Sequence, residues 1–425
     1  MGNGTPLSIP RDVTRRPAFF KQASRRKSVA RPLHLGIDVP LLLIVITLLV
    51  FGLLMVYSAS YDYSIVVLGE PSSYMFQRQL VWFGLGTLAL IVMTVLNYHH
   101  WRILSIPLMG LTLVGLVAVL LAGQVVNNAA RTLLGGSGQP SELAKLATVV
   151  YLSVWLYSKR EQLSDVSFGL IPLGLILGAL GGLIFLEPDL SATATIFIMG
   201  GIMFFLAGGD LRQIGVILVV SVVFGWLIFG IHPTGRERMS AYLLGLNDLT
   251  LAPEHLSRAL EALVKGGWFG VGIGQADTKL LGLPVPPTDS IFAVIGEETG
   301  LLGASAVVAL YVLLLWRGLS IANRAPDGLG KLLAAGLTFW IAIEAFINMA
   351  VLVGLVPFAG NALPFISAGG SSLLVSMAAI GILLNISRQT AEIRQEEESA
   401  FDAVVDLSRR DRGRGVSRSR RPRRS

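Results

Sequence analysis

The sequence predicts an all-α polytopic membrane protein with about ten transmembrane helices and one large extracytoplasmic loop. Hydrophobic residues make up 53% of the 425-residue chain and charged residues only 14%, whereas soluble proteins carry about 25% charged residues. Runs of about 20 apolar residues recur along the chain, and each is long enough to cross a hydrocarbon layer about 30 Å thick. The chain has no cysteine, which excludes disulfides and thiolate chemistry.

Ten apolar segments are candidates for membrane spans. An even number of spans places both termini on one side, and basic tails put that side in the cytoplasm. Short polar connections that begin at Ser158, Gly208 and Arg317 fall on the same side. The predicted spans are 38–58, 80–98, 103–122, 142–158, 166–185, 189–207, 213–231, 290–316, 331–356 and 363–386.

The basic residues are concentrated in two tails. Of the 34 Lys and Arg residues, 8 precede His34 and 11 follow Ser387. Such runs favour membrane lipids as partners and argue against nucleic acid. The low-complexity end of the second tail predicts disorder. We therefore divide the chain into a basic cytoplasmic tail (1–37), a ten-span membrane domain (38–387) and a basic, disordered cytoplasmic tail (388–425).

The one large connection, 232–289, falls outside the membrane in this topology. Residues 254–265 predict an amphipathic helix that lies in the interface plane, either as simple packing or as a lid over a site. Its apolar face carries Leu256, Leu260, Leu263 and Val264, and its polar face Arg258, Glu261 and Lys265. Trp268 and Phe269 follow, as expected of residues at the level of the lipid headgroups.

Ionisable residues fall within several predicted spans, where a charge costs about 2.5–3.5 kcal/mol on insertion scales. Glu142 and Lys145 are three residues apart and share a helix face, so they form either a neutralised ion pair or part of a polar cavity. Asp189 follows Pro188, which breaks the helix before it. The aspartate suits an N-cap of the next helix, and a role in the polar cavity is the alternative.

Three acids stand close together after the large loop. Asp289 precedes an apolar run, where it either caps a helix or does chemistry. Glu297 and Glu298 lie within the run, and their roles stay open between holding the helix beneath Asp289 and lining a cavity. Lys279 follows the glycine-rich "GVGIG", where a lysine can meet a phosphate as a point charge.

Seven separated motifs carry a family resemblance. They are "YSAS" at Tyr57, "RQL" at Arg78, "QPSELAKLA" at Gln139, "EPDLSATA" at Glu187, "GGWFGVGIG" at Gly266, "PPTDSIFAVIGEETG" at Pro286 and "NALPFISAGGSSLL" at Asn361. In content and order they resemble the FtsW/RodA/SpoVE family of polytopic peptidoglycan polymerases, over about residues 38–390. Gly296 makes the chain more similar to FtsW-type members. Three positions depart from the family pattern: Val285, Pro287 and Ala368.

The resemblance implies an inverting glycosyltransferase of the bacterial plasma membrane that polymerises lipid II in cell division or cell-shape maintenance. Undecaprenyl pyrophosphate leaves, and the family's outer-loop aspartate matches Asp289, the candidate general base. A class B penicillin-binding protein, a transpeptidase, is the implied protein partner. No cofactor is required by the sequence, although a divalent cation is compatible with a pyrophosphate leaving group.

Eight further residues are candidates for substrate binding or for the polar cavity. Among the cations, we rank Lys279 first for the pyrophosphate because it shares a loop with Asp289. The candidates are Arg78, Arg131, Glu142, Lys145, Asp189, Arg238, Lys279 and Ser371.

Two other functions fit the same residues. A lipid II transporter (flippase) would also need buried charges and a proline-broken hairpin. A non-catalytic membrane scaffold of the cell-wall synthesis complex would use the tails for binding. A polymerisation assay in detergent separates the first from an enzyme, since detergent removes sidedness and leaves the chemistry.

Overall fold

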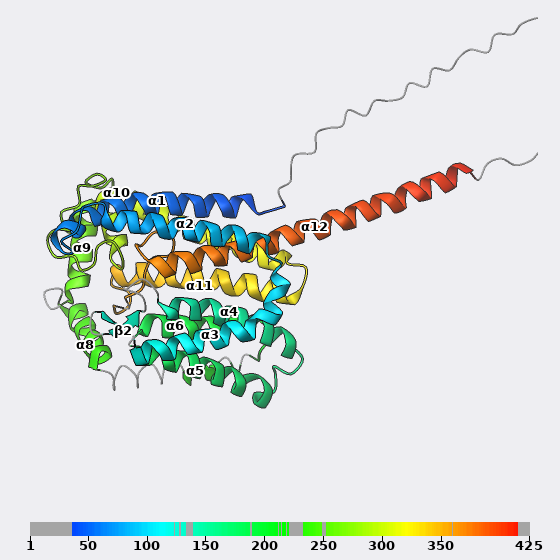
Figure 1. Cartoon of the computed structure of the whole chain (residues 1–425), viewed down its shortest axis with the longest axis horizontal. Coiled ribbons are helices and arrows are strands. Elements are labelled where there is room, and N and C mark those ends of the chain that lie inside the picture. Colours follow the sequence, from blue (N-terminus) through cyan, green and yellow to red (C-terminus); the bar gives the residue numbers. More distant parts are fainter. Residues whose placement is uncertain are drawn as a thin grey trace, which may run out of the picture. The chain divides into compact units, whose positions relative to one another are not determined.

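The computed structural model is predominantly helical, and most helices run side by side in one bundle (Figure 1). It describes residues 36–122, 124–126, 129–132, 139–187, 189–210, 212–213, 215–217, 219–220, 233–248, 252–358 and 360–414. The helices are α1 (Val39–Val66), α2 (Tyr74–Val95), α3 (Trp101–Ala122), α4 (Pro140–Lys159), α5 (Ile171–Leu186), α6 (Leu190–Leu206), α8 (Pro233–Asn247), α9 (Glu254–Gly266), α10 (Ile291–Arg324), α11 (Gly328–Leu352) and α12 (Gly370–Arg414). Short helical turns η1 (Tyr98–His100) and η2 (Val166–Leu170) precede α3 and α5, and β1 (Gln124–Val126) pairs antiparallel with β2 (Ala129–Thr132).

The helices make this a multi-pass membrane protein. Seven of those in the described part of the chain are long and apolar enough to cross a membrane. The 17-residue α6 and the charge-bearing α4 also coincide with predicted spans but are not among the seven. The predicted span 213–231 lies mostly outside the described residues. The all-α class is confirmed, and the number of ten spans stays a prediction.

The turn between α5 and α6 follows the predicted pattern. Helix α5 ends at Leu186 and α6 begins at Leu190. One carboxylate oxygen of Asp189 accepts a hydrogen bond from the backbone N–H of Ala192 at 3.1 Å. The aspartate is therefore the N-cap that its position after Pro188 predicts.

Helix α10, which covers the predicted span 290–316, is interrupted at Gly300. Gly300 has φ 68° and ψ −171°, a backbone conformation that glycine adopts without the penalty a Cβ brings. The break separates a short segment, residues 291–299, from a long one, residues 301–324. The short segment is almost wholly buried, whereas the long one has a stripe of exposed apolar residues. Only the long segment has the surface of a lipid-facing span.

Helices α8 and α9 lie across one end of the bundle, which we call the loop end (Figure 1). Helix α9 packs against α10 and α11. The face that it buries carries Leu256, Ala259, Ala262 and Gly266, while Val264 is 81% exposed. The predicted helix is confirmed, but its buried face is rotated from the predicted one, because small residues allow α9 to approach α10 closely.

Helix α12 continues beyond the predicted end of the last span. Its backbone is helical through Arg414, so residues 388–414 are not the disordered segment that the composition suggests. Good helix formers and spaced opposite charges explain the difference. Arg388 and Glu392 form one such pair, with 3.4 Å between Nε and Oε1.

Candidate active site

Asp289 is a half-buried residue at the start of the short buried segment of α10. The N-cap residue of this helix is Ser290, not Asp289. The main-chain carbonyl oxygen of Asp289 accepts a hydrogen bond from the side-chain amide of Asn348 at 3.0 Å. A carboxylate oxygen lies 3.6 Å from the place where a Cβ on Gly360 would stand. The capping interpretation therefore loses its geometric basis, and the carboxylate faces the loop around Gly360.

Two loops interlock around this aspartate. The backbone N–H of Ala368 donates to the carbonyl of Pro287 at 2.8 Å. The hydroxyl of Ser367 donates to the carbonyl of Thr288 at 2.6 Å. From α2, the buried Gln79 donates to the carbonyl of Ser367 at 3.3 Å. The motif at Asn361 thus fixes the chain immediately before the aspartate, although more than 70 residues separate them in sequence.

A buried polar network lies beneath the loops. The ammonium of Lys145 lies 2.8 Å from a carboxylate oxygen of Glu142 and also binds the carboxylate of Glu344 on α11. The carbonyl of Glu344 accepts from the amide of Asn361 at 2.8 Å. Asn348 donates to the carbonyl of Asn361 at 2.6 Å, in addition to its bond with the aspartate loop. The network thus joins α4 and α11 to the loop that carries Asp289.

Glu344 is the member of this network that sequence reasoning missed. It is a single acid inside the apolar run "FWIAIEAFI" of α11 and is 3% exposed. A carboxylate at that depth requires a cationic partner, and the presence of Lys145 within another predicted span was the available signal. The predicted ion pair of Glu142 and Lys145 is in fact a triad with two acids.

A second polar cluster surrounds Asp189. Its carboxylate accepts from the side-chain amide of Gln139 at 3.0 Å and from the hydroxyl of Ser141 at 3.2 Å. The backbone N–H of Gln139 donates to the hydroxyl of Ser371 at 3.3 Å. Ser141 is adjacent to Glu142 on α4. The structure therefore brings four candidates from three helices into one polar region: Glu142, Lys145, Asp189 and Ser371.

The acids in the short α10 segment hold the glycine-rich loop. Glu297 accepts from the backbone N–H of Asp277 at 3.0 Å and from the hydroxyl of Thr278. Glu298 lies 3.2 Å from the ammonium of Lys279 and accepts from the hydroxyl of Ser58 on α1 at 2.6 Å. Both partners of the ion pair are buried. The first of the two open roles, holding structure around Asp289, is the one that this geometry favours.

Lys279 is thus neutralised within the protein. Besides Glu298, its ammonium donates to the carbonyl of Ser58 at 3.2 Å and to the carbonyl of Gly274 at 3.1 Å. The side chain is 4% exposed. A cation with this many partners has little capacity left for a pyrophosphate.

Arg238 on α8 lies on the other flank of the aspartate. Its guanidinium carbon is 5.2 Å from the ring centre of Phe358. The ring of His255 stacks on Phe358, with 4.0 Å between centroids. Phe358 in turn lies beside Gly360, which faces the carboxylate of Asp289. Burial and the charge of Arg238 lower the pKa of His255 to about 4, so the imidazole is neutral at physiological pH.

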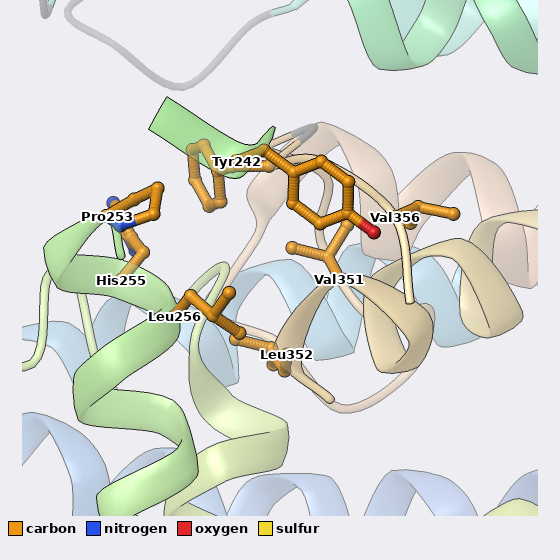
Figure 2. A pocket seen from close by; sticks show the side chains of 8 residues that line it. Tyr242, Pro253, His255, Leu256, Val351, Leu352 and Val356 are labelled. Carbon is orange, nitrogen blue, oxygen red and sulfur yellow. The ribbon is translucent and has the colours of Figure 1, made fainter. Parts of the chain in front are cut away.

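A small pocket lies behind this stack, between α8, α9 and the end of α11 (Figure 2). Pro253, His255, Leu256 and Val351 are among the residues that line it, and the hydroxyl of Tyr242 donates to the carbonyl of Gly354 at 3.1 Å. The cavity volume is about 10 Å³, room for about one water molecule. The pocket is therefore too small to be a sugar site.

Two candidates remain, Arg78 and Arg131. Arg78 is exposed on α2, while the next residue, Gln79, is the buried member of the pair. Arg131 lies in β2, and its side chain is outside the described part of the structure.

Comparisons with known proteins agree on one family. A family model described as "Cell cycle protein", FTSW_RODA_SPOVE, matches residues 39–392. A probable peptidoglycan glycosyltransferase FtsW from Trichlorobacter lovleyi is 38% identical over 360 residues, which cover 82% of this chain and 93% of that protein. Stage V sporulation protein E from Bacillus subtilis is 36% identical and covers 83% and 97%.

Two solved structures are similar to the whole bundle. One, described as "Structural coordination of polymerization and crosslinking by a peptidoglycan synthase complex", is matched with a TM-score of 0.68 and 25% identity. The other is the rod shape determining protein RodA of Thermus thermophilus, with a TM-score of 0.62 and 27% identity. Each match covers 84% of this chain and 99% of the other.

Proposed function

The chain belongs to the FtsW/RodA/SpoVE family of cell cycle proteins, and from this membership we propose that it polymerises lipid II outside the bacterial plasma membrane. It is a peptidoglycan glycosyltransferase, as its curated relatives are named. The substrate and the sidedness are the parts that we add. In this proposal both termini are cytoplasmic, and the loop end of the bundle faces outward, where lipid-linked sugars are presented.

The proposed step is a single displacement with inversion. The hydroxyl of a terminal acceptor sugar attacks the anomeric carbon of the donor, a new glycosidic bond forms, and the bond to undecaprenyl pyrophosphate breaks. Asp289 takes the proton from the attacking hydroxyl, and the pyrophosphate leaves with the bonding electron pair. A positioned general base contributes about 10²–10⁴-fold to such a step. This step needs no cofactor.

The observation that carries the proposal is the setting of Asp289. The residue is half-buried, and its main chain is held by Asn348 through the carbonyl oxygen. The hydrogen bonds to Pro287, Thr288 and the carbonyl of Asp289 act on the loop backbone and fix the position of the residue. A base needs such an arrangement, because it must be placed within hydrogen-bond reach of the acceptor.

Arg238 is the cation that we assign to the leaving pyrophosphate in place of Lys279. The stack of His255, Phe358 and Arg238 extends toward Asp289 through Gly360. A guanidinium matches a phosphate in bidentate geometry and keeps its charge at every physiological pH. The aromatic ring beneath it restricts where the charge can lie.

The test is polymerisation by the purified protein. Asp289→Asn, incubated with lipid II in detergent, is expected to lose about 10²–10⁴-fold in the rate of glycan-strand formation. Asp277→Asn is the matched control, because it makes the same chemical change on an exposed residue whose backbone, not its side chain, binds Glu297. Unchanged thermal unfolding would show that the fold is kept. Normal turnover by Asp289→Asn would refute the base assignment.

The polar network in the bundle also favours a second candidate, transport of lipid II. Intramembrane charges such as Lys145 and Glu344 are typical of substrate or proton pathways. The same assay decides between the two functions, since a transporter makes no glycan strands in detergent.

The proposed protein partner is a class B penicillin-binding protein, a transpeptidase. We expect that the Asp289→Asn variant still assembles the complex with it, because the scaffold role does not require the catalytic base.

A further inference from the structure

The loop that follows α9 exposes an unusual number of apolar side chains. Trp268 is 67% exposed and Phe269 82%. In water such a cluster is unfavourable and marks an interaction surface. Together with the end of α9, the exposed set is Val264, Trp268, Phe269, Val271, Ile273, Leu280 and Leu281.

This loop is fixed to the break in α10. The backbone N–H of Leu301 donates to the carbonyl of Gly267 at 2.8 Å, and that of Leu302 to the carbonyl of Trp268 at 3.2 Å. The N–H groups of Val271 and Gly272 donate to the carbonyls of Glu297 and Glu298 at 2.9 and 3.1 Å. These backbone groups are satisfied within the protein, as a low-dielectric environment requires.

The loop packs directly on the α10 backbone because its glycines have no side chains. A Cβ on Gly270 would stand 2.2 Å from the carbonyl oxygen of Glu298. A Cβ on Gly266 would stand 2.0 Å from the carbonyl oxygen of Gly296. The apolar side chains of the loop are therefore held outward by a rigid attachment.

The exposed surface of the loop continues into the lipid-facing stripe of α10. Leu301 and Leu302, which bind the loop backbone, are 51% and 54% exposed. The stripe then follows the helix through Val312 and Trp316. The two surfaces meet at these hydrogen bonds. Whatever covers the exposed side chain of Leu301, lipid or water, therefore also covers that of Trp268.

The depth of the loop follows from the lengths of two helices. Helix α1 begins at the bundle end opposite the loop end (Figure 1). Its N-cap Asp38 pairs with Arg317 of α10 at 2.8 Å, so this ion pair belongs to that end. Leu301 is 16 residues from Arg317, or about 24 Å along the helix. Ser58, which binds Glu298 and Lys279, is 20 residues from Asp38, or about 30 Å.

These lengths place the loop at the boundary of the hydrocarbon. The hydrocarbon layer is about 30 Å thick, and the ion pair of Asp38 and Arg317 marks its opposite edge. Measured from that edge, Leu301 and the attached Trp268 lie within the layer, while the ion pair of Lys279 and Glu298 lies at its near edge. Tilting the helices shortens both distances along the membrane normal and leaves this order unchanged.

We propose that the segment from Gly266 to Leu281 is inserted in the membrane leaflet at the loop end, where acyl chains cover Trp268, Phe269 and Ile273. The segment is a rigid wedge rather than a solvent-exposed loop. It therefore sets the height of Asp289 above the lipid from which the substrates are presented. This inference stands on the packing and the helix lengths and is independent of the base assignment.

The absence of cysteine makes the proposal directly testable. Single variants Phe269→Cys and Ile273→Cys carry a nitroxide label in lipid nanodiscs, without other proteins. Ala309→Cys, exposed midway along the long α10 segment, is the reference in the hydrocarbon, and Ser240→Cys, exposed on α8, is the reference in water. Electron paramagnetic resonance measures the accessibility of each label to oxygen and to a polar nickel complex.

We expect the labels at 269 and 273 to be several-fold more accessible to oxygen than to nickel, with ratios between those of the two references. Nickel accessibility equal to that of the label at 240 would overturn the proposal. Shielding from both reagents would overturn it too, because it would mean that protein covers the segment. An unfolding temperature equal to that of the parent protein shows that each labelled variant keeps the native fold.

Discussion

Asn348 links the candidate base to the neighbouring loop with one amide group. Its nitrogen donates to the carbonyl of Asp289 at 3.0 Å and to the carbonyl of Asn361 at 2.6 Å. The Asn348→Leu variant keeps a similar volume and leaves both carbonyls without this donor, which costs about 1–3 kcal/mol per buried group. A displacement of about 1 Å at a reacting group can cost about 10² in rate.

We therefore expect Asn348→Leu to lower kcat by up to about 100-fold while KM for lipid II changes little, since no substrate contact is removed. Steady-state polymerisation of lipid II measures both constants. An effect on KM alone would mean that Asn348 contacts the substrate rather than positions Asp289.

The triad around Lys145 is expected to dominate the stability of the bundle interior. Lys145→Met leaves the carboxylates of Glu142 and Glu344 without their shared cation, and breaking a buried pair costs about 3–5 kcal/mol. Lys265→Met is the control, because its partner Glu261 lies on the exposed face of α9 and exposed pairs contribute little to stability. Thermal unfolding in detergent compares the two, and equal losses would contradict the buried role of Lys145.

Gly270 and Gly274 have similar φ angles, so replacing each of them with alanine separates the cost of backbone strain from the cost of a steric clash. Gly270 has φ 81° and Gly274 has φ 86°, but only a Cβ on Gly270 meets the α10 backbone. Gly274→Ala is expected to cost about 1–2 kcal/mol for its backbone conformation, and Gly270→Ala distinctly more. Unfolding temperatures measure the difference. If both variants unfold at the same temperature, the loop is not packed against α10 as described.

The stability of the loop end is expected to fall in acid. The pKa of His255 is lowered from 6.5 to about 4 by burial and by Arg238. Between these values the unfolded chain binds a proton that the folded protein excludes, so the free energy of unfolding rises with pH across this window and falls as pH drops from about 6.5 to about 4. His255→Phe keeps a ring on Phe358 and removes this titration.

Unfolding temperatures at pH 7.5 and pH 5 check this sign. The loss of stability at pH 5 is expected to be smaller in His255→Phe than in the parent protein. An identical loss in both proteins would place the acid-sensitive group elsewhere.

Features with a local cause were predictable from the sequence. Asp189 after Pro188 is a cap because the break and the anion are adjacent, and Glu142 with Lys145 is a pair because three residues separate them on a helix. Features that depend on distant packing were not predictable. The break at Gly300 exists because the loop around Gly270 binds there, and nothing in the sequence distinguishes Gly300 from the nearby Gly296 and Gly303, which stay helical. Likewise, the partner of Lys279 is set by the meeting of the loop, α1 and α10.

The break at Gly300 also makes the position of Asp289 independent of the length of the membrane-crossing part of α10. If α10 were continuous, its 34 residues would form a rod about 51 Å long, and the aspartate would shift with every residue added to fit a thicker bilayer. Since the loop holds the short segment in place, residues 301–324 can be lengthened or shortened by whole turns without moving the carboxylate. Adaptation to bilayers of different thickness and preservation of the reaction geometry are thereby assigned to separate parts of one helix.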